Sequence, residues 1–494
     1  MPQKPHVLDY EPVLRTGSGI DSVDAHAEEW FDPPELSPDQ EQPLLPEQKA
    51  ETVEPAKPYQ QVKTWKTLHQ KAHAVSYFGL VLFTIILYYR PYELSTSLVW
   101  MQSSAFVVAV FTLLFYIPTQ LGLHGNLTAR PREINLILLF LLAAVLSLPL
   151  AIEQTWAWNT FQTFLKVVLM FIVMVNVVLT RKRLRALILL ALFTSCILSA
   201  SAVNDYRLGK LALGNERIQG LIGNLFDNPN DLALHLVTMI PLAIAFLMVS
   251  RNGIKKLIFA GAAVLMVAGV VATFSRGGFI GTIVIFGMLA WRLSKRNKLL
   301  IATCLPVALI LFMIFAPGGY RTRLGTTADD SAGARYDELK RSIFVALHHP
   351  ILGVGMNNYV NYSNLNHATH NAYTQVASEL GIPAMVIYIM FLIAPLKRLR
   401  RIERETISQR EKSEFYYFAI GLEVSLIGYM TASFFLSVAY LWYLYYLVAY
   451  TICLARLYEW SLQGKPAQLA ASTVLKTNAV RSSKSNSIEV KSFS

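Results

Sequence analysis

The chain has 494 residues, of which 54% are hydrophobic and only 15% are charged. Soluble domains carry about 25% charged residues, so this composition excludes a disordered chain, a disulfide-rich secreted domain and an ordinary soluble enzyme. The mean hydropathy of +0.40 favours a protein with many membrane-spanning helices. The net charge of +12 comes from short basic clusters between apolar runs, as in membrane topology signals, and we expect no nucleic-acid partner.

The first 60 residues differ from the rest of the chain. They contain ten prolines, with 13 acidic against 4 basic residues. Such a composition predicts a disordered acidic tail, and a cytoplasmic partner for this tail is an open possibility. The tail does not begin with a basic stretch followed by an apolar one, so we do not expect a cleavable signal peptide. Residues 461–494 are predicted to form a second disordered cytoplasmic tail.

Residues 74–460 are predicted to form an all-α polytopic membrane domain with about twelve transmembrane helices, because apolar runs near the bilayer-spanning length follow one another. The predicted spans are 74–90, 98–118, 134–151, 160–179, 184–203, 232–250, 255–273, 278–293, 299–316, 382–396, 415–435 and 437–457. The boundary between the last two spans is the least defined, because almost nothing separates them. The three cysteines lie inside these runs, which indicates buried small side chains.

Lysine and arginine mark one side of the predicted membrane domain. Residues 180–185 hold four of these basic residues, residues 251–256 three, residues 292–298 four and residues 397–412 seven. These segments are alternate loops, so the positive-inside rule predicts that both termini are cytoplasmic. Two longer polar loops then face outward, residues 204–231 and the large loop 317–381, which is too long to be a simple connector. We expect any chemistry on this outer face.

Two arginines of the outward side are candidates for anion binding. Arg217 lies among glycines that let backbone approach a ligand, and guanidinium groups bind phosphate bidentately. Snorkelling of Arg217 to lipid headgroups is the alternative. Arg276, in the stretch TFSRGGFIG, joins two apolar runs with almost no loop. A charge held at the membrane face is costly without a partner or a water-filled cavity, which favours a function for Arg276.

The large loop contains His367, His370 and Asn371 in the stretch HATHN. Apolar residues at helical spacing predict a helix before this stretch, which ends near Pro350. A second helical stretch, with Glu379 at its end, follows it. Histidine can accept a proton near neutral pH, as a base for a hydroxyl acceptor must. The alternative is a histidine that only packs or caps the loop. A zinc site at His367 and His370 is disfavoured, because Glu379 is the only obvious third ligand nearby.

Two charges lie inside predicted spans. Lys166 is expected near the outer third of its helix, where it either lines a site or snorkels to the surface. Glu423 is expected near the middle of its helix, where it is either protonated or paired within the bundle.

Together, TFSRGGFIG, HHPILGVGMNNY and HNAYTQVASELGI resemble the O-antigen ligase and O-antigen polymerase superfamily. RPYEL at residues 90–94 is also similar to some members. The resemblance covers about residues 74–460 and leaves out the acidic tail. Its members are bacterial inner-membrane glycosyltransferases with many helices and one large outer loop.

The resemblance implies an undecaprenyl-diphosphate-linked glycan donor, a glycan or lipid-core acceptor with a free hydroxyl, and no cofactor or metal. Arg217 and Arg276 match the arginines that hold the diphosphate in ligases, and His370 matches the histidine that activates or positions the acceptor. The implied transfer is inverting and takes place at the outer face of the membrane. Further candidates for contact with substrate are Arg321, Arg323, Arg335, Arg341, Asn371, Glu379 and Lys166.

Three functions stay open at this point. A ligase transfers a finished glycan to a surface acceptor, whereas a polymerase of the same family, for O-antigen or exopolysaccharide, transfers a growing chain to one repeat unit. The match of both arginine segments favours the ligase slightly. The third function is a transporter of lipid-linked glycans, which is disfavoured because no second related half is evident.

Overall fold

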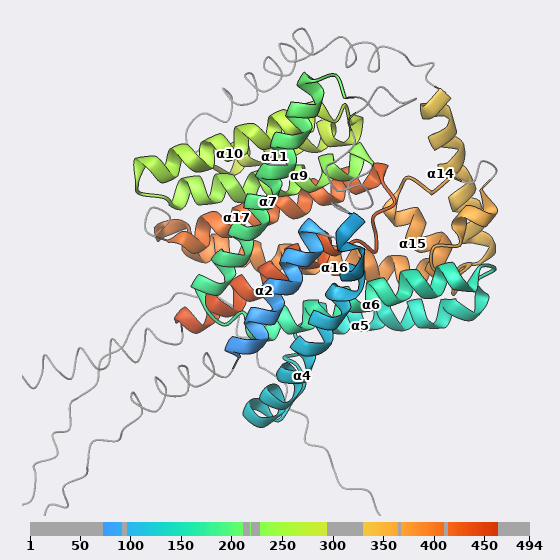
Figure 1. The fold of residues 1–494 in the computed structure, drawn as a ribbon, viewed down its shortest axis with the longest axis horizontal. Coiled ribbons are helices and arrows are strands. Elements are labelled where there is room, and N and C mark those ends of the chain that lie inside the picture. The colour runs from blue at the N-terminus through green and yellow to red at the C-terminus, as the bar shows by residue number, and fades with distance from the viewer. Residues whose placement is uncertain are drawn as a thin grey trace, which may run out of the picture. The chain divides into compact units, whose positions relative to one another are not determined.

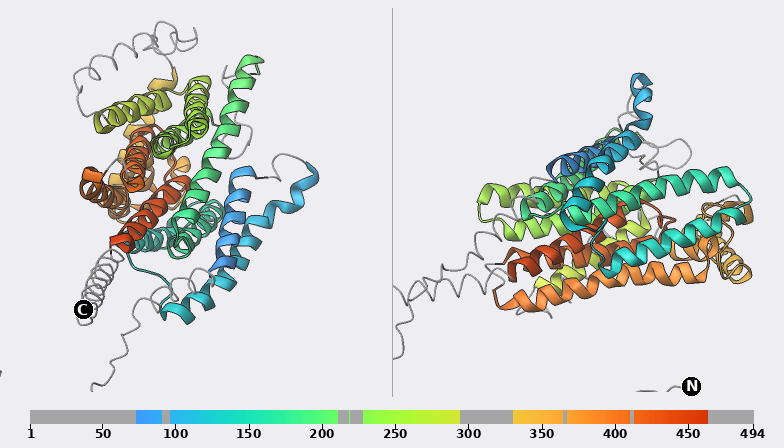
Figure 2. Two further views of the ribbon diagram at one scale, coloured as in Figure 1. Left: turned by 90° about the vertical axis from the view of Figure 1, so that its left-hand side faces the viewer. Right: turned by 90° about the horizontal axis from the view of Figure 1, so that it is seen from below.

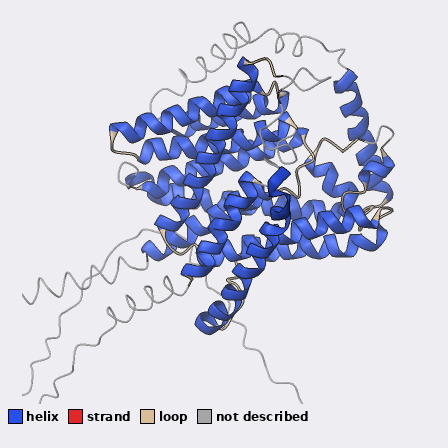
Figure 3. Ribbon diagram, viewed as in Figure 1, coloured by secondary structure: helices blue, strands red, loops and turns tan. Residues whose placement is uncertain are grey.

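The computed structural model describes residues 73–90, 96–210, 218, 228–293, 330–363, 367–409 and 413–462. The predicted N-terminal tail, the predicted span 299–316 and residues 463–494 lie outside these ranges. Within the described ranges every regular element is a helix (Figure 3). These residues all belong to the compact unit of residues 57–494.

Helices make up most of the described ranges. They are α2 (Ala74–Tyr89), η1 (Thr96–Ser103), α4 (Ser104–His124), α5 (Arg132–Ser147), η2 (Leu148–Leu150), α6 (Gln154–Val177), α7 (Arg181–Arg207), α9 (Pro229–Val249), α10 (Gly253–Ala272), α11 (Arg276–Leu293), α14 (Asp330–His348), η3 (Tyr359–Tyr362), α15 (Ala372–Leu380), α16 (Ile382–Thr406), η4 (Ile407–Gln409), α17 (Glu414–Ala432) and η5 (Ser433–Phe435). Residues 442–462 form a further helix.

Among the described helices, nine are long and apolar enough to cross a membrane, and α2 is a shorter apolar helix. The fold class predicted from the apolar runs is therefore confirmed. The helix after α17 begins at residue 442 rather than at the predicted 437, because residues 433–435 form η5 and an irregular segment follows.

The bundle has central helices and peripheral ones (Figures 1 and 2). The most apolar windows of α9 and α17 are 78% and 72% buried, and α17 packs against α9, α11 and α16. The corresponding windows of α4 and α10 are only 22% buried. Peripheral helices expose residues such as Leu114 and Leu257, an apolar surface that a bilayer would cover.

Glycines allow the central helices to approach closely. A Cβ atom built on Gly278 of α11 would lie 2.6 Å from Cβ of Ala233 on α9. A Cβ atom on Gly428 of α17 would lie 2.6 Å from Cγ2 of Ile285 on α11. Helices in membranes associate by such close packing, so Gly278 holds the start of α11 against the start of α9, and Gly428 holds α17 against α11.

Arginines and glutamates pair at the end of the bundle where α11 and α16 finish. Glu423 of α17 has a side chain only 1% exposed, and its Oε1 lies 2.7 Å from Arg292 of α11 and 2.8 Å from Arg400 of α16. Arg292 also lies 3.0 Å from Glu403. Of the two interpretations of Glu423, the structure supports pairing. These ion pairs tie α11, α16 and α17 together.

The opposite end of the bundle carries the described parts of the large loop. Helix α14 lies across the bundle axis at this end, beside the short helix α15 (Figures 1 and 2). Helix α15 packs against α14, α16, α5 and η5. The described residues of the large loop thus pack on the ends of several helices and cover this end of the bundle.

Candidate active site

The HATHN stretch forms the entry to α15. Asn371 is the N-cap of this helix, and its Oδ1 accepts hydrogen bonds from the backbone N–H groups of Tyr373 and Thr374. An asparagine at this position satisfies amide groups that would otherwise lack a partner. The prediction that His370 stands where a helix begins is therefore confirmed. Thr369 adds a hydrogen bond of 2.8 Å to Ser437, which joins the loop to the segment after η5.

His370 has a backbone φ of 50°, in the left-handed region that few residues with a side chain adopt. Such a conformation costs energy and persists only where surrounding structure enforces it, which is typical of functional loops. The enforcing contacts are the Asn371 cap on one side and the Thr369 bond on the other.

The pKa of His370 is lowered to about 4 by burial, then by the charges of Arg335 and His367, while Glu338 acts in the opposite direction. The imidazole is therefore neutral at neutral pH, and a neutral ring can accept a hydrogen bond or a proton. The same result shows that Arg335, on the first half of α14, is near enough to act on His370. The structure thus brings together two of the residues predicted from the sequence.

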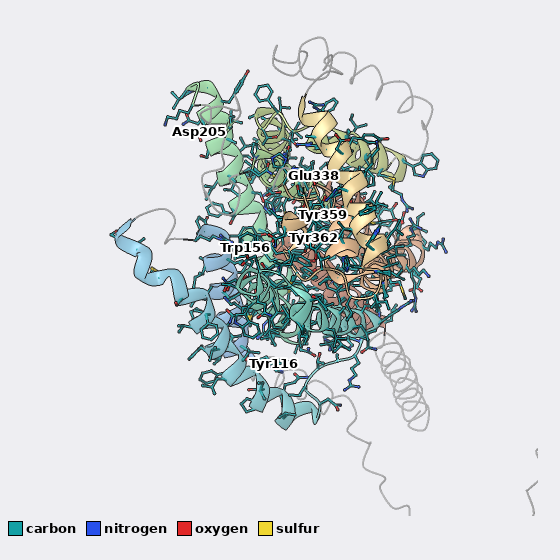
Figure 4. The ribbon with its side chains drawn as sticks, turned by 90° about the vertical axis from the view of Figure 1, so that its right-hand side faces the viewer. Tyr116, Trp156, Asp205, Glu338, Tyr359 and Tyr362 are labelled. Carbon is teal, nitrogen blue, oxygen red and sulfur yellow. The ribbon has the colours of Figure 1, made fainter. Side chains whose placement is uncertain are left out.

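Glu338 is a buried acidic residue of this region, with 4% of its surface exposed. Its Oε2 accepts a hydrogen bond of 2.6 Å from Tyr359, and its Oε1 accepts one of 2.7 Å from Ser363. Figure 4 shows Glu338 on α14, with Tyr359 and Tyr362 on the loop beneath it. Burial and the Glu338 carboxylate raise the pKa of Tyr359 above its ordinary value, so its hydroxyl stays protonated as a donor.

The turn around Gly353 and Gly355 rests on the end of α15. Backbone N–H groups of Val354 and Gly355 donate to the carbonyls of Ser378 and Glu379 at 2.9 and 3.0 Å. Both glycines have positive φ, and a Cβ on Gly353 would lie 2.3 Å from the Glu379 carbonyl carbon. Only glycine permits this close approach.

The Glu379 carboxylate points inward at the same place. Its Oε2 accepts hydrogen bonds from Tyr440 at 2.8 Å and from the Asn357 backbone N–H at 2.9 Å. Burial raises its pKa to about 7, although these hydrogen bonds act to lower it. Glu379 therefore holds the turn at Asn357 in place. The contact of Glu379 with substrate stays a prediction.

Arg276 is the first residue of α11, and only residues 273–275 separate this helix from α10. The next residue, Gly277, packs on Phe435 of η5, where a built Cβ would lie 3.1 Å from the Phe435 Cβ atom. Thr369, one residue before His370, bonds Ser437 of the same short segment. The start of α11 and the HATHN stretch therefore pack on positions two residues apart, which brings the regions of Arg276 and His370 to a common support.

The other predicted site residues have different surroundings. Arg341 is exposed and donates from Nε to the Tyr362 carbonyl at 2.8 Å, so it holds η3. Helix α6 begins at residue 154 rather than at the predicted 160, which places Lys166 near the middle of the helix, 6.0 Å from the Phe106 ring centroid. Arg217, Arg321 and Arg323 lie outside the described residues.

Two residues near His370 were not among those predicted. Glu338 and Ser363 lie 25 residues apart in the chain and meet only in the folded loop. The sequence does indicate that Glu338 lies near Arg335, because residues three apart share one face of a helix. The rings of His367 and His370 are 6.4 Å apart, and the described residues contain no group of three His, Cys, Asp or Glu suited to hold a metal.

Comparison with known proteins gives one family. Residues 261–389 match the family model described as O-antigen ligase. This segment includes Arg276, Arg335, Glu338 and His370. No curated protein matches the chain. The match confirms the resemblance drawn from the sequence motifs, and with the apolar helices it indicates a bacterial membrane protein of surface polysaccharide biosynthesis. Residues 261–389 thus place an O-antigen ligase family domain within this chain.

Proposed function

We propose that the chain is a glycosyltransferase of the O-antigen ligase type, which moves a glycan from an undecaprenyl-diphosphate donor to an acceptor hydroxyl at the outer membrane face. The observation that carries this proposal is the common support of the start of α11 and the HATHN stretch on residues 433–437. It joins a cation suited to a diphosphate with a neutral imidazole suited to a hydroxyl.

The transfer needs one bond to break and one to form. The bond between the anomeric carbon and the diphosphate oxygen breaks, the acceptor oxygen bonds that carbon from the opposite side, and the centre is inverted. Positive charge fixed near the diphosphate stabilises the leaving group, a role that we assign to Arg276 and, outside the described residues, to Arg217. The hydroxyl proton passes to His370 and then to water.

Substrate binding itself makes His370 a better base in this mechanism. In the free protein the pKa of His370 is lowered to about 4, partly by the positive charge of Arg335. A diphosphate beside Arg335 would offset that charge and favour the protonated imidazole. The acid limb of a pH–rate profile is the fall in rate as the essential base becomes protonated. For kcat this limb reports the enzyme–substrate complex, and for kcat/KM it reports the free enzyme. We therefore expect the acid limb of kcat at higher pH than the acid limb of kcat/KM.

The basic clusters support the orientation of this site. Arg292, Arg398 and Arg400 lie at the end of the bundle opposite α15, which the positive-inside rule assigns to the cytoplasm. Under that orientation α14, α15 and the start of α11 face outward. This arrangement suits a lipid-linked donor, since the diphosphate sits at the membrane surface while the prenyl chain lies along exposed apolar helices.

The proposal can be tested with purified protein in proteoliposomes that contain an undecaprenyl-diphosphate glycan and a hydroxyl acceptor. We expect glycosylated acceptor and free undecaprenyl diphosphate in equal amounts. Movement of intact donor between leaflets without bond cleavage would instead establish a transporter and overturn the proposal.

A second experiment separates the ligase from the polymerase. Mass spectrometry of lipid-linked glycans from cells that carry His370→Ala reports which step is missing. Long lipid-linked polymer is expected if the chain is a ligase. Accumulation of single repeat units would show that it is a polymerase.

A further inference from the structure

The Glu338 carboxylate occupies a position that packing alone does not explain. Its exposed fraction is 4%, and a charge this enclosed needs hydrogen-bond partners. Both of its described partners come from one segment of the large loop, Tyr359 at 2.6 Å and Ser363 at 2.7 Å. Charge-assisted bonds of this length are strong, so Glu338 fixes the end of that segment on α14.

The contact continues from Ser363 toward the HATHN stretch. The Ser363 hydroxyl donates its proton to Glu338, and its Oγ accepts the backbone N–H of His367 at 3.0 Å. The His367 ring lies 6.4 Å from the His370 ring. Two consecutive hydrogen bonds therefore connect the carboxylate on α14 with the beginning of the loop that holds His370 in its left-handed conformation.

The charges around His370 give Glu338 a second effect. Arg335 on α14 and His367 in the loop act to lower the pKa of His370, and Glu338 acts to raise it. On the other side, residues 433–441 contribute only Tyr440 as a titratable group, and it bonds Glu379. Arg276 begins the helix that packs on η5. Among the groups that shift the pKa of His370, Glu338 is thus the acidic one, and its effect opposes that of Arg335.

We propose that Glu338 is a positioning residue for His370, which holds residues 367–371 on α14 through Ser363 and balances the charge of Arg335. This inference rests on the proposed function and deepens it, because it assigns an orienting partner to the residue that receives the acceptor proton.

The test compares four variants in the proteoliposome assay. Glu338→Gln removes the charge, Glu338→Asp keeps the charge but shortens the side chain, and Ser363→Ala breaks the link to His367. Asp337→Asn is the matched control, because Asp337 is the adjacent residue of α14 and is exposed. Elution on size exclusion and the melting temperature in detergent identify any variant that fails to fold.

We expect Glu338→Gln, Glu338→Asp and Ser363→Ala each to lower kcat by about tenfold to 100-fold, with KM for the donor changed less than about twofold. Only Glu338→Gln should move the acid limb of kcat, by about one unit to lower pH, because it alone removes the negative charge. Asp337→Asn should match wild type in both measurements.

Failure of this inference can be told apart from failure of the proposed function. If His370→Ala abolishes transfer while folded Glu338→Gln keeps wild-type kcat and the wild-type acid limb, the positioning role is wrong and the proposed function stands. If Glu338→Gln lowers kcat without moving the acid limb, the charge-balancing role is wrong. If the wild-type protein transfers no glycan, the proposed function itself fails.

Discussion

The two ends of the helix bundle use carboxylates in different ways. At the end where α11 and α16 finish, Glu423 and Glu133 lie within 2.8 Å of arginine nitrogens. At the opposite end, Glu338 and Glu379 accept hydrogen bonds from hydroxyl and backbone N–H groups. Charge is neutralised by charge at the first end, whereas at the second the described bonds come from neutral donors.

This difference has a physical consequence for each end. An arginine–carboxylate pair cancels its own field and serves mainly to fix helices in place, and removing one partner is costly. A carboxylate bound by neutral donors has no paired cation to cancel its field, so it acts on its neighbours, as Glu338 does on His370. We therefore expect loss of an ion pair at the first end to change stability, and substitution of Arg276, Glu338 or His370 at the second to change activity.

His370→Ala gives the largest expected effect at the outer end. Removing the group that accepts the hydroxyl proton should lower kcat by about 10²–10⁴-fold. The measurement is initial-rate transfer in proteoliposomes, and the matched control is His349→Ala, which removes an exposed histidine of the same loop. Equal activity of the two variants would contradict the assigned role of His370.

Arg276→Ala and Arg292→Ala sharpen the comparison most directly, because these arginines lie at the two ends of α11. Arg276→Ala should lower kcat by about 10²-fold at an unchanged melting temperature, since a cation beside the leaving group stabilises the transition state. Transfer rates and thermal unfolding in detergent are measured on the same preparation. A variant with full activity would exclude Arg276 from the diphosphate site.

Arg292→Ala should show the opposite pattern. It leaves the buried Glu423 with one arginine fewer and takes the partner from Glu403, at a cost of about 3 kcal/mol in the free energy of unfolding. We expect a lower melting temperature, with kcat of the remaining folded protein near wild type. Arg292→Lys, which keeps the charge, should recover part of the loss. If Arg292→Ala lost activity without losing stability, the distinction between the two ends would be wrong.

The comparison also explains what the sequence could predict. The spans are predictable because the length of an apolar run is a local property, and the helix after HATHN is predictable because a helical pattern follows this polar stretch. The last helix begins later than its apolar run predicts, because contacts with distant residues hold residues 436–441 out of a helix, among them the bond of Ser437 to Thr369. Tertiary contacts of this kind leave no periodic signal in the sequence.

The same limit applies within the site. His370 and Arg276 were predicted from short motifs, whereas Glu338 gains its role only when Ser363, 25 residues later, reaches its carboxylate. Lys166 lies nearer the middle of its helix than its apolar run indicates, because α6 already begins at the polar residue Gln154. Motifs therefore identified the residues predicted to react, and the fold adds a residue that holds one of them.

Glu379→Gln gives the smallest expected effect and tests the outer end alone. Burial raises the pKa of Glu379 to about 7 from an unfolded value of 4.5. A carboxyl group with a raised pKa contributes stability that is fully present below pH 4.5 and is lost as the pH rises through about 7. Wild type should therefore lose about 2–4 °C in melting temperature between pH 5 and pH 8 relative to Glu379→Gln, whose amide does not titrate.

Glu405→Gln is the control, because the exposed Glu405 pairs with Arg401 at the opposite end. If wild type and Glu379→Gln showed the same pH dependence, Glu379 would be ionised in the folded protein, and its hydrogen bonds from Tyr440 and Asn357 would outweigh the cost of burial.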